Sequence, residues 1–526
     1  MRTIIQWRSL LVLLACSPLF FTAVGECAVI HVKPEGNNAN DGLTWDNAKQ
    51  IVQAGLNTAV SGDEVWVATG TYIERIILKQ GVGLYGGFAG TETTWDQRDW
   101  TANVTVLDGN KGGSVVTSSS GATATTRIDG FTIRNGTGID NGWEIGLMIG
   151  GGIYCYGSDL TIANNIITGN SANFQGAGIY CYYSSPTITN NTIIGNTGGD
   201  RGGSGICCAS SSPTIANNTI AGNGPGTAIY CDSSTTVANS IVAFNTNGID
   251  GSSGTVLKHN CVYNPAGTNY HGLSPGATDI QVDPLFVDRV AGDYHLTFAS
   301  PCINAGDNSV VQPGWVDMDG QARIQGLYVD IGADEVLPAT ISAILASGWN
   351  LISLPAQPAN VDPAEVFVGV PITDRLYRYD TALLSYVSYW DLNPSEFGPV
   401  RLGEGYWLAL DQPTIVSYQC YPVAASKSIS LSLTGWHLLG TPQNGEVILA
   451  DCSVANTSQG RTVSYAGAVS EGWIQEQMYG WFPAQTRYWE VGLEGQPMND
   501  DNTLRHWCGY WFQSLTPDLT LVVPGL

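Results

Sequence analysis

Alternating apolar and polar residues recur at a regular interval through the middle of the chain. A Gly/Ala-Ile-Tyr/Cys-Cys motif occupies residues 152–155, 178–181, 205–208 and 228–231. The isoleucines of successive copies are 26, 27 and 23 residues apart. Alternation over a few residues predicts a short β-strand with one face in the core, and a fixed interval between such strands predicts a repeat architecture.

A second motif follows each copy and supplies turns between strands. It contains Asn164, Asn190, Asn217 and Asn239, which are 26, 27 and 22 residues apart. Asparagine tolerates the left-handed backbone conformation of tight turns, and its amide can bond to neighbours above and below it in a stack. Such a repeat predicts a parallel β-solenoid, because the leucine framework of a leucine-rich repeat is absent.

The two-residue period of a strand assigns each side chain of the Ile-Tyr-Cys strands to a face. Isoleucine lies in the core, so the cysteine two positions later points inward with it. The inward cysteines are Cys155, Cys181, Cys208 and Cys231. We expect buried free thiols, because parallel stacking does not bring the side chains together as a disulfide requires. The residues predicted to face outward, as candidates for stacking on sugars, are Tyr154, Tyr180 and Tyr230, with Cys207 in the same phase.

After residue 337 the pattern changes to strands rich in tryptophan. Gly-Trp-Asn-Leu-Ile-Ser-Leu-Pro at residues 348–355 recurs as Gly-Trp-His-Leu-Leu-Gly-Thr-Pro at residues 435–442. Gly-Tyr-Trp-Leu at residues 405–408 likewise recurs as Gly-Tyr-Trp-Phe at residues 509–512. Short, turn-bounded strands predict two small β-sandwich or barrel-like lobes, at about residues 340–425 and 426–526.

The tryptophans of these lobes have two interpretations. The ones that recur in both lobes are predicted to fill the lobe cores, and the alternative is a platform on which sugars stack. These recurring residues are Trp349, Trp407, Trp436 and Trp511. The less regular tryptophans are better candidates for an exposed, ligand-binding surface: Trp473, Trp481, Trp489 and Trp507.

Residues 1–25 have the features of a secretory signal peptide. Arg2 and Arg8 accompany an apolar stretch at residues 10–21, and residues 23–25, Ala-Val-Gly, fit a small-x-small cleavage site. We therefore expect a secreted or cell-surface protein. The competing interpretation is a lipid anchor at Cys16, which follows Leu-Leu-Ala. No later stretch approaches the ~20 apolar residues of a membrane span.

The net charge of the chain restricts which kinds of partner are expected. Asp and Glu number 45 against 21 Lys and Arg, which gives a net charge of −24, although only 13% of the residues are charged. An acidic surface repels nucleic acid and anionic lipid, so neither is an expected partner. The 12 cysteines form no C-x-x-C pair and the 6 histidines are scattered, so a zinc site is not expected either.

Segments outside the clear repeats carry a family resemblance. Residues 62–90, 106–109 and 128–136 resemble opening coils of secreted bacterial right-handed parallel β-helix proteins, and residues 46–60 would be their capping helix, with Asp46 as N-cap. Asp-Pro-Leu-Phe-Val at residues 283–287 and Val-Asp-Ile-Gly-Ala-Asp-Glu at residues 329–335 resemble the closing segment of the choice-of-anchor Q group. The tail resembles the Gly-Trp-Asn-Leu-Ile-Ser-Leu-Pro repeats of many secreted bacterial proteins.

This resemblance implies an all-β chain with two parts. The first is a right-handed parallel β-helix of the pectin-lyase-like fold at residues 28–336, with an N-terminal capping helix. The second is the C-terminal β-sandwich or barrel-like module of two pseudo-repeats at residues 340–526. No particular reaction is implied, because this fold carries lyases, hydrolases, epimerases and proteins without activity.

Polysaccharide cleavage on a β-helix requires charged side chains that converge on one face. The charged residues of the regular coils, residues 150–245, are Asp159, Asp200, Arg201 and Asp232. The remaining catalytic candidates are Arg127, Asp129 and Arg134, with Trp143 and Glu144 placed in a loop that would cover a groove. This poverty of charge favours a non-catalytic protein, and the alternative is a polysaccharide lyase or glycoside hydrolase.

Residues 317–320, Asp-Met-Asp-Gly, have the first half of a calcium-binding loop. The EF-hand pattern is incomplete because Tyr328 stands where its last glutamate would be. A non-standard Ca²⁺ site would use Asp317, Asp319, Asp330 and Asp334. The alternative is a solvated turn, and no other cofactor is expected.

Three classes of function are compatible with these patterns. A monomeric surface or secreted interaction protein, with the solenoid as a stiff spacer, fits the low charge of the coils best. A carbohydrate-binding protein fits the outward tyrosines and the tryptophan-rich tail, and its expected partner is a polysaccharide or cell-surface glycan. A polysaccharide-active enzyme is the third class, and acidity disfavours uronate substrates for it unless Ca²⁺ intervenes.

Overall fold

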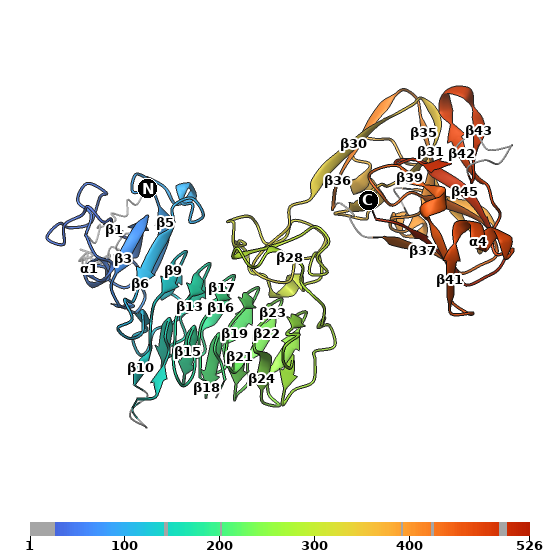
Figure 1. Ribbon diagram of the computed structural model, residues 1–526. Coiled ribbons are helices and arrows are strands. Elements are labelled where there is room, and N and C mark those ends of the chain that lie inside the picture. Colours follow the sequence, from blue (N-terminus) through green and yellow to red (C-terminus); the bar gives the residue numbers. More distant parts are fainter. Residues whose placement is uncertain are drawn as a thin grey trace, which may run out of the picture.

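A right-handed parallel β-helix is followed by a closing segment and then by a C-terminal module of two β-sandwich lobes (Figure 1). The structure, a computed structural model, describes residues 27–140, 142, 146–199, 202–390, 393–421, 426–493 and 502–525. The prediction of an all-β fold with this order of parts is confirmed. The predicted signal peptide and the Cys16 alternative lie outside the described residues. None of the helices in the described part of the chain has the length and apolar character that crossing a bilayer requires.

Three parallel sheets run the length of the β-helix, and each coil gives one strand to each sheet. Sheet A contains β1 (Val29–Val32), β2 (Glu64–Ala68), β5 (Gly83–Phe88), β8 (Arg127–Asp129), β13 (Thr161–Ala163), β16 (Thr187–Thr189), β19 (Thr214–Ala216), β22 (Thr236–Ala238) and β25 (Val256–Lys258). Sheet B contains β3 (Gly70–Ile73), β6 (Thr105–Asp108), β9 (Thr132–Arg134), β14 (Ile166–Thr168), β17 (Thr192–Ile194), β20 (Thr219–Ala221), β23 (Ile241–Ala243) and β26 (Cys261–Tyr263). Sheet C contains β4 (Ile76–Ile77), β7 (Val116–Thr117), β12 (Ile153–Tyr156), β15 (Ile179–Tyr182), β18 (Ile206–Ala209), β21 (Thr227–Cys231), β24 (Asn247–Gly251) and β27 (Tyr270–His271).

The register of sheet C stacks identical positions of the repeat on one another. Ile153 pairs with Ile179, and Cys155 pairs with Cys181 in the same ladder. All four inward cysteines are free and buried, as predicted: Cys155, Cys181, Cys208 and Cys231. Cys207 has the outward phase that was predicted, since it pairs with Tyr180 in the ladder, but it is fully buried there. It packs with Ile149 and Tyr180 in a second apolar cluster on the outer side of the sheet.

Asparagines satisfy the backbone where each coil turns from one sheet to the next. The predicted turn residues have positive φ, with 55° at Asn164 and 54° at Asn190. Other asparagines, at the next corner of each coil, form a ladder along the axis. In this ladder Asn170 Nδ2 donates to Asn196 Oδ1 at 3.1 Å, and Asn196 Nδ2 donates to Asn223 Oδ1 at 3.0 Å. A buried polar group without a partner costs about 1–3 kcal/mol, so these ladders let coils bury their corners.

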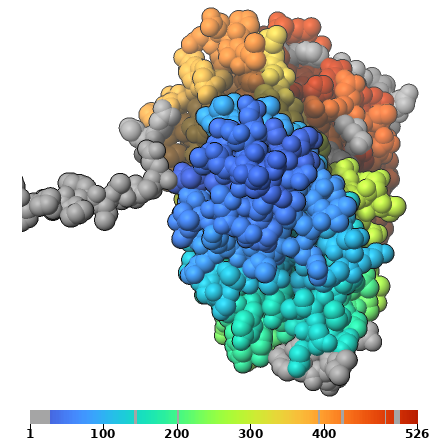
Figure 2. Space-filling view, turned by 90° about the vertical axis from the view of Figure 1, so that its left-hand side faces the viewer, coloured from blue at the N-terminus to red at the C-terminus, as the bar shows by residue number. Residues whose placement is uncertain are grey.

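The capping helix is shorter than predicted. Helix α1 spans Val52–Thr58, and its N-cap residue is Ile51, so the assignment of Asp46 as N-cap is wrong. The Glu74 carboxylate takes that role, since it accepts from the N–H groups of Val52 and Gln53 at 2.7 and 3.0 Å. A side chain from the neighbouring coil therefore determines where the helix begins. Figure 2 views this end of the solenoid, where the first coils (blue) cover the opening.

The closing segment, residues 280–336, folds back over the outer face of sheet B (Figure 1). Its Gly332 and Ala333 N–H groups donate to the Asn239 carbonyl and to Thr219 Oγ1, at 2.9 and 3.0 Å. The Trp100 indole N–H donates to the Met318 carbonyl at 3.0 Å, far toward the N-terminal coils. Two hairpin pairs belong to the irregular parts of the solenoid: β10 (Ile139–Asp140) with β11 (Met148–Ile149), and β28 (Phe286–Asp288) with β29 (Asp293–Leu296).

The C-terminal module contains two lobes, and each lobe packs two antiparallel sheets on one core. The first lobe contains β30 (Ala339–Leu345), β36 (Thr414–Tyr421) and β32 (Gln357–Pro358) in one sheet, and β31 (Gly348–Ser353), β35 (Gly405–Leu410), β33 (Leu376–Asp380) and β34 (Ser385–Ser388) in the other. The second contains β37 (Lys427–Leu431), β46 (Leu519–Val523), β40 (Ser453–Asn456) and β41 (Arg461–Ser464), then β38 (Gly435–Gly440), β45 (Gly509–Ser514), β42 (Met478–Phe482) and β43 (Arg487–Val491), and the small pair β39 (Val447–Ile448) and β44 (Thr503–Leu504). Short helices connect strands: α2 (Pro363–Val366), α3 (Pro394–Phe397), α4 (Tyr465–Ser470) and 3-10 turns at Trp95–Gln97, Asn308–Val310, Leu449–Asp451 and Pro483–Gln485.

Asn196→Ala tests the ladder. The substitution removes the acceptor of the Asn170 N–H and a donor to the Ile167 carbonyl and to Asn223. We expect the free energy of unfolding to fall by about 2–4 kcal/mol, since several buried groups lose their partners. Chemical denaturation measures the loss. Thr214→Ala, at an exposed position of sheet A, is the control and should change it by less than about 0.5 kcal/mol; equal effects of the two substitutions would contradict a structural role for the ladder.

Thiol labelling tests the cysteine stack. The exposed Cys27 should react in the native protein, whereas the four stacked thiols should react only after denaturation without reductant. Mass spectrometry of labelled peptides distinguishes the sites. A disulfide mapped between any two of the stacked cysteines would show that the side chains converge, contrary to the parallel register.

Candidate functional site

The C-terminal module carries its recurring aromatic residues on the sheet faces that point away from the lobe cores. In β35, Tyr406 belongs to the core of the first lobe, and its neighbour Trp407 lies on the opposite face. In β45, Tyr510 and Trp511 divide in the same way between the core of the second lobe and its outer face. Strand alternation alone therefore produces an aromatic outer face on each lobe.

The two aromatic faces pack against each other. Tyr379 of the first lobe meets Trp511 of the second, with ring centroids 4.9 Å apart in an edge-to-face arrangement. Trp481 of the second lobe meets Trp407 of the first in the same manner, at 5.4 Å. Edge-to-face contacts of this kind are favourable beyond the area they bury.

The contacts are reciprocal because the lobes are related as pseudo-repeats. In the ladders, Tyr377 lies opposite Trp407, and Tyr479 lies opposite Trp511. The equivalent positions are Trp349 and Trp436, Leu351 and Leu438, Trp407 and Trp511, Tyr377 and Tyr479, Tyr379 and Trp481, and Tyr386 and Tyr488. Such a reciprocal interface is the geometry of a two-fold pair.

Backbone hydrogen bonds between the lobes follow the same reciprocity. The Ser353 N–H donates to the Trp507 carbonyl at 3.3 Å, and at the equivalent place the Gly440 N–H donates to the Gly403 carbonyl at 2.9 Å. Ser353 Oγ adds a bond to the Cys508 carbonyl at 2.8 Å. These bonds hold the aromatic faces at a defined separation.

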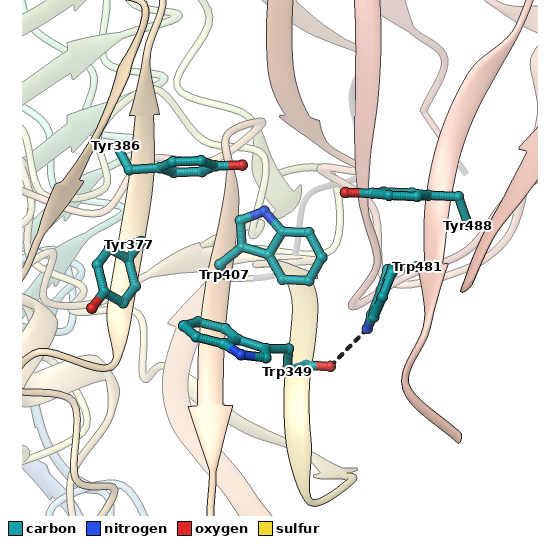
Figure 3. Close-up of a pocket in the computed structure, with 6 residues that line it drawn as sticks. All are labelled: Trp349, Tyr377, Tyr386, Trp407, Trp481 and Tyr488. Carbon is teal, nitrogen blue, oxygen red and sulfur yellow. Dashed lines mark hydrogen bonds between the residues drawn. The ribbon is translucent and has the colours of Figure 1, made fainter. Parts of the chain in front are cut away.

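Two open aromatic clefts result, one on each side of the contact between the lobes. The first cleft has a volume of about 420 Å³ and is lined by Trp349, Tyr377, Tyr386, Trp407, Trp481 and Tyr488 (Figure 3). The second cleft has a volume of about 530 Å³ and is lined by Tyr379, Trp436, Tyr479, Tyr488, Glu490 and Trp511. Under the equivalence of the lobes, five of the six residues of the first cleft map onto residues of the second, and Glu490 takes the remaining place.

Polar groups in the first cleft are phenols and indoles. The Trp481 indole N–H donates to the Trp349 carbonyl at 2.9 Å. Burial raises the pKa of Tyr386, with a smaller opposing effect of its hydrogen bond to Trp407, so its hydroxyl is protonated at neutral pH. Figure 3 shows the hydroxyls of Tyr386 and Tyr488 pointing toward one another across the cleft. A phenol both donates and accepts a hydrogen bond.

The prediction for the tryptophans is largely reversed by the structure. Trp349 and Trp436, predicted to fill cores, are 47% and 38% exposed, because the lobe cores lie on the other face of their strands. The tryptophans predicted to be exposed but found buried in the lobe cores are Trp473, Trp489 and Trp507. Of the proposed ligand-binding tryptophans in this module, Trp481 lines a cleft and Trp473 does not.

The outward tyrosines of sheet C do not form an open platform. Tyr154 and Tyr180 stack with centroids 6.0 Å apart and planes 2° apart. Tyr180 is only 1% exposed, so the prediction that it is accessible is wrong. Ile149 of β11 and the partly buried Phe174, in the loop before β15, pack with it. Tyr154 and Tyr230 are half-buried, and Trp143 lies outside the described residues.

The catalytic candidates lie on different sheets and are bound in separate ion pairs. Asp129 on sheet A is held by Arg98 at 2.7 Å and by Arg127 at 2.5 Å, and it accepts from Asn164 at 2.9 Å. The arginines hold the pKa of Asp129 below its ordinary value despite its burial. Arg134 on sheet B binds Asp108 at 2.9 Å. Arg127, Asp129 and Arg134 are therefore not brought together as a base and a charge stabiliser.

The four aspartates proposed for Ca²⁺ do not share one centre. Asp317 accepts from the N–H groups of Asp319 and Gln321, and Asp330 accepts from Asn304 and Val336, so both serve the backbone of the closing segment. Asp319 and Asp334 instead approach His295, a residue the sequence did not single out. His295 lies in β29, and only tertiary structure brings it near residues 319 and 334.

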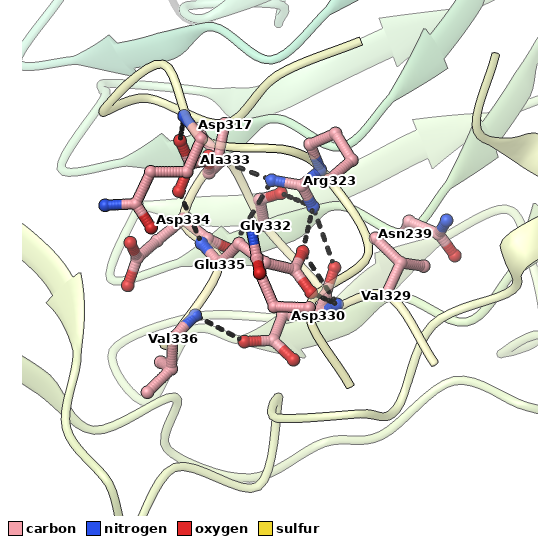
Figure 4. Close-up of polar contacts among 12 residues, drawn as sticks. Asn239, Asp317, Arg323, Val329, Asp330, Gly332, Ala333, Asp334, Glu335 and Val336 are labelled. Atoms are coloured by element: carbon pink, nitrogen blue, oxygen red, sulfur yellow. Dashed lines mark hydrogen bonds and ion pairs between the residues drawn. The ribbon is translucent and has the colours of Figure 1, made fainter. Parts of the chain in front are cut away.

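A buried ionic network organises the end of the closing segment (Figure 4). The fully buried Arg323 donates to the carbonyls of Asp330, Gly332 and Ala333, at 3.0 Å each, and lies 3.4 Å from a Glu335 carboxylate oxygen. Burial raises the pKa of Asp317 to about 6, and burial also raises the pKa of Asp330 and Glu335. Arginine binding to several carbonyls fixes the loop that covers sheet B.

Comparisons with known proteins find partial matches. The family described as Periplasmic copper-binding protein (NosD) matches residues 56–271, and the family described as Disaggregatase related matches residues 243–313. The solved structure of the pectate lyase Pel9A is 13% identical, with 59% of this chain and 96% of that chain covered and a TM-score of 0.34. No curated protein matches the chain.

The closing segment should lose stability as pH rises. Its buried carboxyls have raised pKa values, so the native protein holds their protons more tightly than the unfolded chain does. Their contribution is complete below the ordinary carboxyl pKa of about 4 and is lost as pH rises through the raised values. We expect the midpoint temperature of thermal denaturation to decrease as the pH is raised from about 5 to about 8.

Glu335→Gln should flatten this pH dependence, because the amide does not ionise. Glu365→Gln, at an exposed glutamate of α2, is the matched control and should preserve the slope. Thermal unfolding followed by circular dichroism across this pH range provides the measurement. Identical slopes for Glu335→Gln and the parent would show that the buried network does not control the dependence.

Proposed function

We propose that this chain is a non-catalytic interaction protein of the cell exterior or periplasm, in which the β-helix is a stiff spacer and the C-terminal module binds glycan. The observation that carries the proposal is the first aromatic cleft. Its six lining side chains are all Trp or Tyr. Aromatic faces offer apolar contact to the C–H face of a sugar ring, and the phenol hydroxyls serve its hydroxyl groups.

The spacer role rests on how the coils are joined. Each coil pairs with the next through three parallel ladders, and the asparagine ladders add bonds along the axis. The N–H groups of Gly332 and Ala333 bond the closing segment to the solenoid. The module then contacts the closing segment through Ala359 and Tyr421. A spacer built this way presents the aromatic clefts at the far end of a rigid stem.

The charged groups of the coils support binding rather than cleavage. The arginines and carboxylates with the best claim to chemistry are already paired: Arg98 and Arg127 with Asp129, and Arg134 with Asp108. A general base held in a short ion pair is not available to take a proton from a substrate at neutral pH. Polysaccharide lyase or hydrolase activity would require these pairs to separate.

The proposed location of the protein and the question of a copper cofactor rest on different observations. The predicted signal peptide and the word periplasmic in the description of the matching NosD family both support export. Copper, which the same description names, is not part of the proposal. Among the described residues the group of potential ligands is His295, Asp319 and Asp334, which lies beyond the matched residues. Within the match, His259 is bonded to the Ala305 carbonyl and His271 is exposed beside Asp250.

A glycan array with the purified full chain, with and without Ca²⁺, tests the proposal. We expect binding to uncharged glycans without Ca²⁺ dependence, and no release of unsaturated uronate from pectate or alginate. Trp349→Ala should weaken binding in the first cleft by about tenfold or more, because an exposed stacking surface is removed there.

Trp390→Ala is the matched control for this experiment, since Trp390 is 48% exposed and lines neither cleft. It should leave glycan binding unchanged. Failure of the parent protein to bind any glycan, or turnover that Arg127→Ala abolishes, would refute the proposed function.

A further inference from the structure

The two lobes present the same binding chemistry twice. In each lobe an exposed tryptophan, Trp349 or Trp436, stands at the edge of a cleft whose floor is Trp407 or Trp511. We propose that the module has two equivalent sites for uncharged glycan segments, one in each cleft, so that one protein molecule binds two segments. This inference rests on the proposed function and adds the number of sites and the charge of the ligand.

Each cleft is built from both lobes. The first cleft takes three aromatic residues from β31, β33 and β35 of its own lobe, and Trp481 from the other lobe closes it. The second cleft takes three from β38, β42 and β45, and Tyr379, the equivalent of Trp481, closes it. Each lobe therefore contributes residues to both clefts. The same contact between the lobes completes both clefts.

Features that the clefts share indicate the chemistry of the ligand. Both have tryptophan and tyrosine walls, and both reach the Tyr488 side chain. They differ in charge, since Glu490 lines the second cleft, whereas the described residues that line the first are all uncharged. A ligand that binds both must depend on stacking and hydroxyl contacts, which describes an uncharged sugar. Anionic glycans are further disfavoured by the net charge of −24.

Two other ligands use aromatic surfaces and are weaker fits. A quaternary ammonium group binds an aromatic cage and gains from a nearby carboxylate, which the first cleft lacks. A proline-rich peptide presents carbonyl acceptors, but the Trp481 indole N–H already donates to the Trp349 carbonyl. A sugar brings both donors and acceptors, which matches the phenol hydroxyls that face each other in Figure 3.

The two clefts are neighbours, since Tyr488 lines both, and this has a consequence for long ligands. A short oligosaccharide fills each cleft separately, so two molecules bind per protein. A longer chain that reaches both clefts makes its second contact within the same complex, and its affinity then exceeds that of either site. Binding should therefore tighten with chain length, while stoichiometry falls from two ligands per protein toward one.

Isothermal titration of the full chain with a short neutral oligosaccharide, chosen from the array, tests the inference. We expect a stoichiometry of two. Trp349→Ala and Trp436→Ala should each reduce it to one, and the double variant should lose binding by about tenfold or more at both sites. The control Trp390→Ala should keep two sites. Trp349→Phe and Trp436→Phe retain an aromatic face, so they should keep measurable binding, which shows that the alanine variants act by removing stacking.

The outcomes separate this inference from the proposed function. A stoichiometry of one, with binding sensitive to only one of the two tryptophans, overturns the paired sites while leaving glycan binding intact. No glycan binding by the parent overturns both. Tetramethylammonium and a polyproline peptide are tested as competing ligands. If either binds in the clefts and neither glucose-type nor mannose-type oligosaccharides displace it, the assignment of an uncharged glycan is overturned. Circular dichroism of each variant establishes that it is folded.

Discussion

Stacking of successive coils in parallel register is the constraint on which the rest of the β-helix depends. Every strand must bond to the coil above and the coil below, so a position in one coil stands over the same position in the next. Ile153 above Ile179 and Cys155 above Cys181 follow directly from this register. At the corners, where strands end and backbone groups would be left unpaired, the Asn170, Asn196 and Asn223 ladder provides the missing bonds.

The same register creates outer faces that other parts of the chain cover. Thr219 and Ile241 belong to sheet B, and the closing segment packs over them through Gly332, Ala333 and Ile331. On sheet C, Ile149 of β11 and the loop residue Phe174 pack with Tyr180. Parts of the outer faces of sheets B and C are thereby covered by the protein itself. The arginines at residues 98, 127 and 134 are held in ion pairs with Asp129 and Asp108.

In the C-terminal module, strand alternation produces outer faces that are only partly covered. One face of each inner sheet fills a lobe core, with Tyr406 and Tyr510 inside. The other face carries Trp407 and Trp511, and the two faces meet only over part of their area, through Tyr379 and Trp481. The parts that do not meet remain as clefts. An interface between pseudo-repeats thus leaves paired aromatic surfaces open to ligand, which neither lobe would form alone.

The features that depend on the local period of the side chains were predictable from the sequence. Repeats of 22–27 residues with inward Ile and Cys predicted the β-helix, its buried thiols and its left-handed asparagine turns, and the 87-residue recurrence of the Gly-Trp motif predicted two lobes. These succeed because alternation and turn chemistry act within a few residues.

Only tertiary structure decided which faces are covered. A strand has two faces, and the sequence pattern of Trp349 or Tyr180 does not state whether another element lies over the second one. Trp349 is predicted inside but is exposed, because the lobe core lies on the other face of its strand. Tyr180 is predicted outside but is buried, because Ile149 of β11 and Phe174 pack with it. Glu74 at the start of α1 and His295 beside Asp319 and Asp334 are likewise contacts between coils or loops far apart in the chain, which no local pattern encodes.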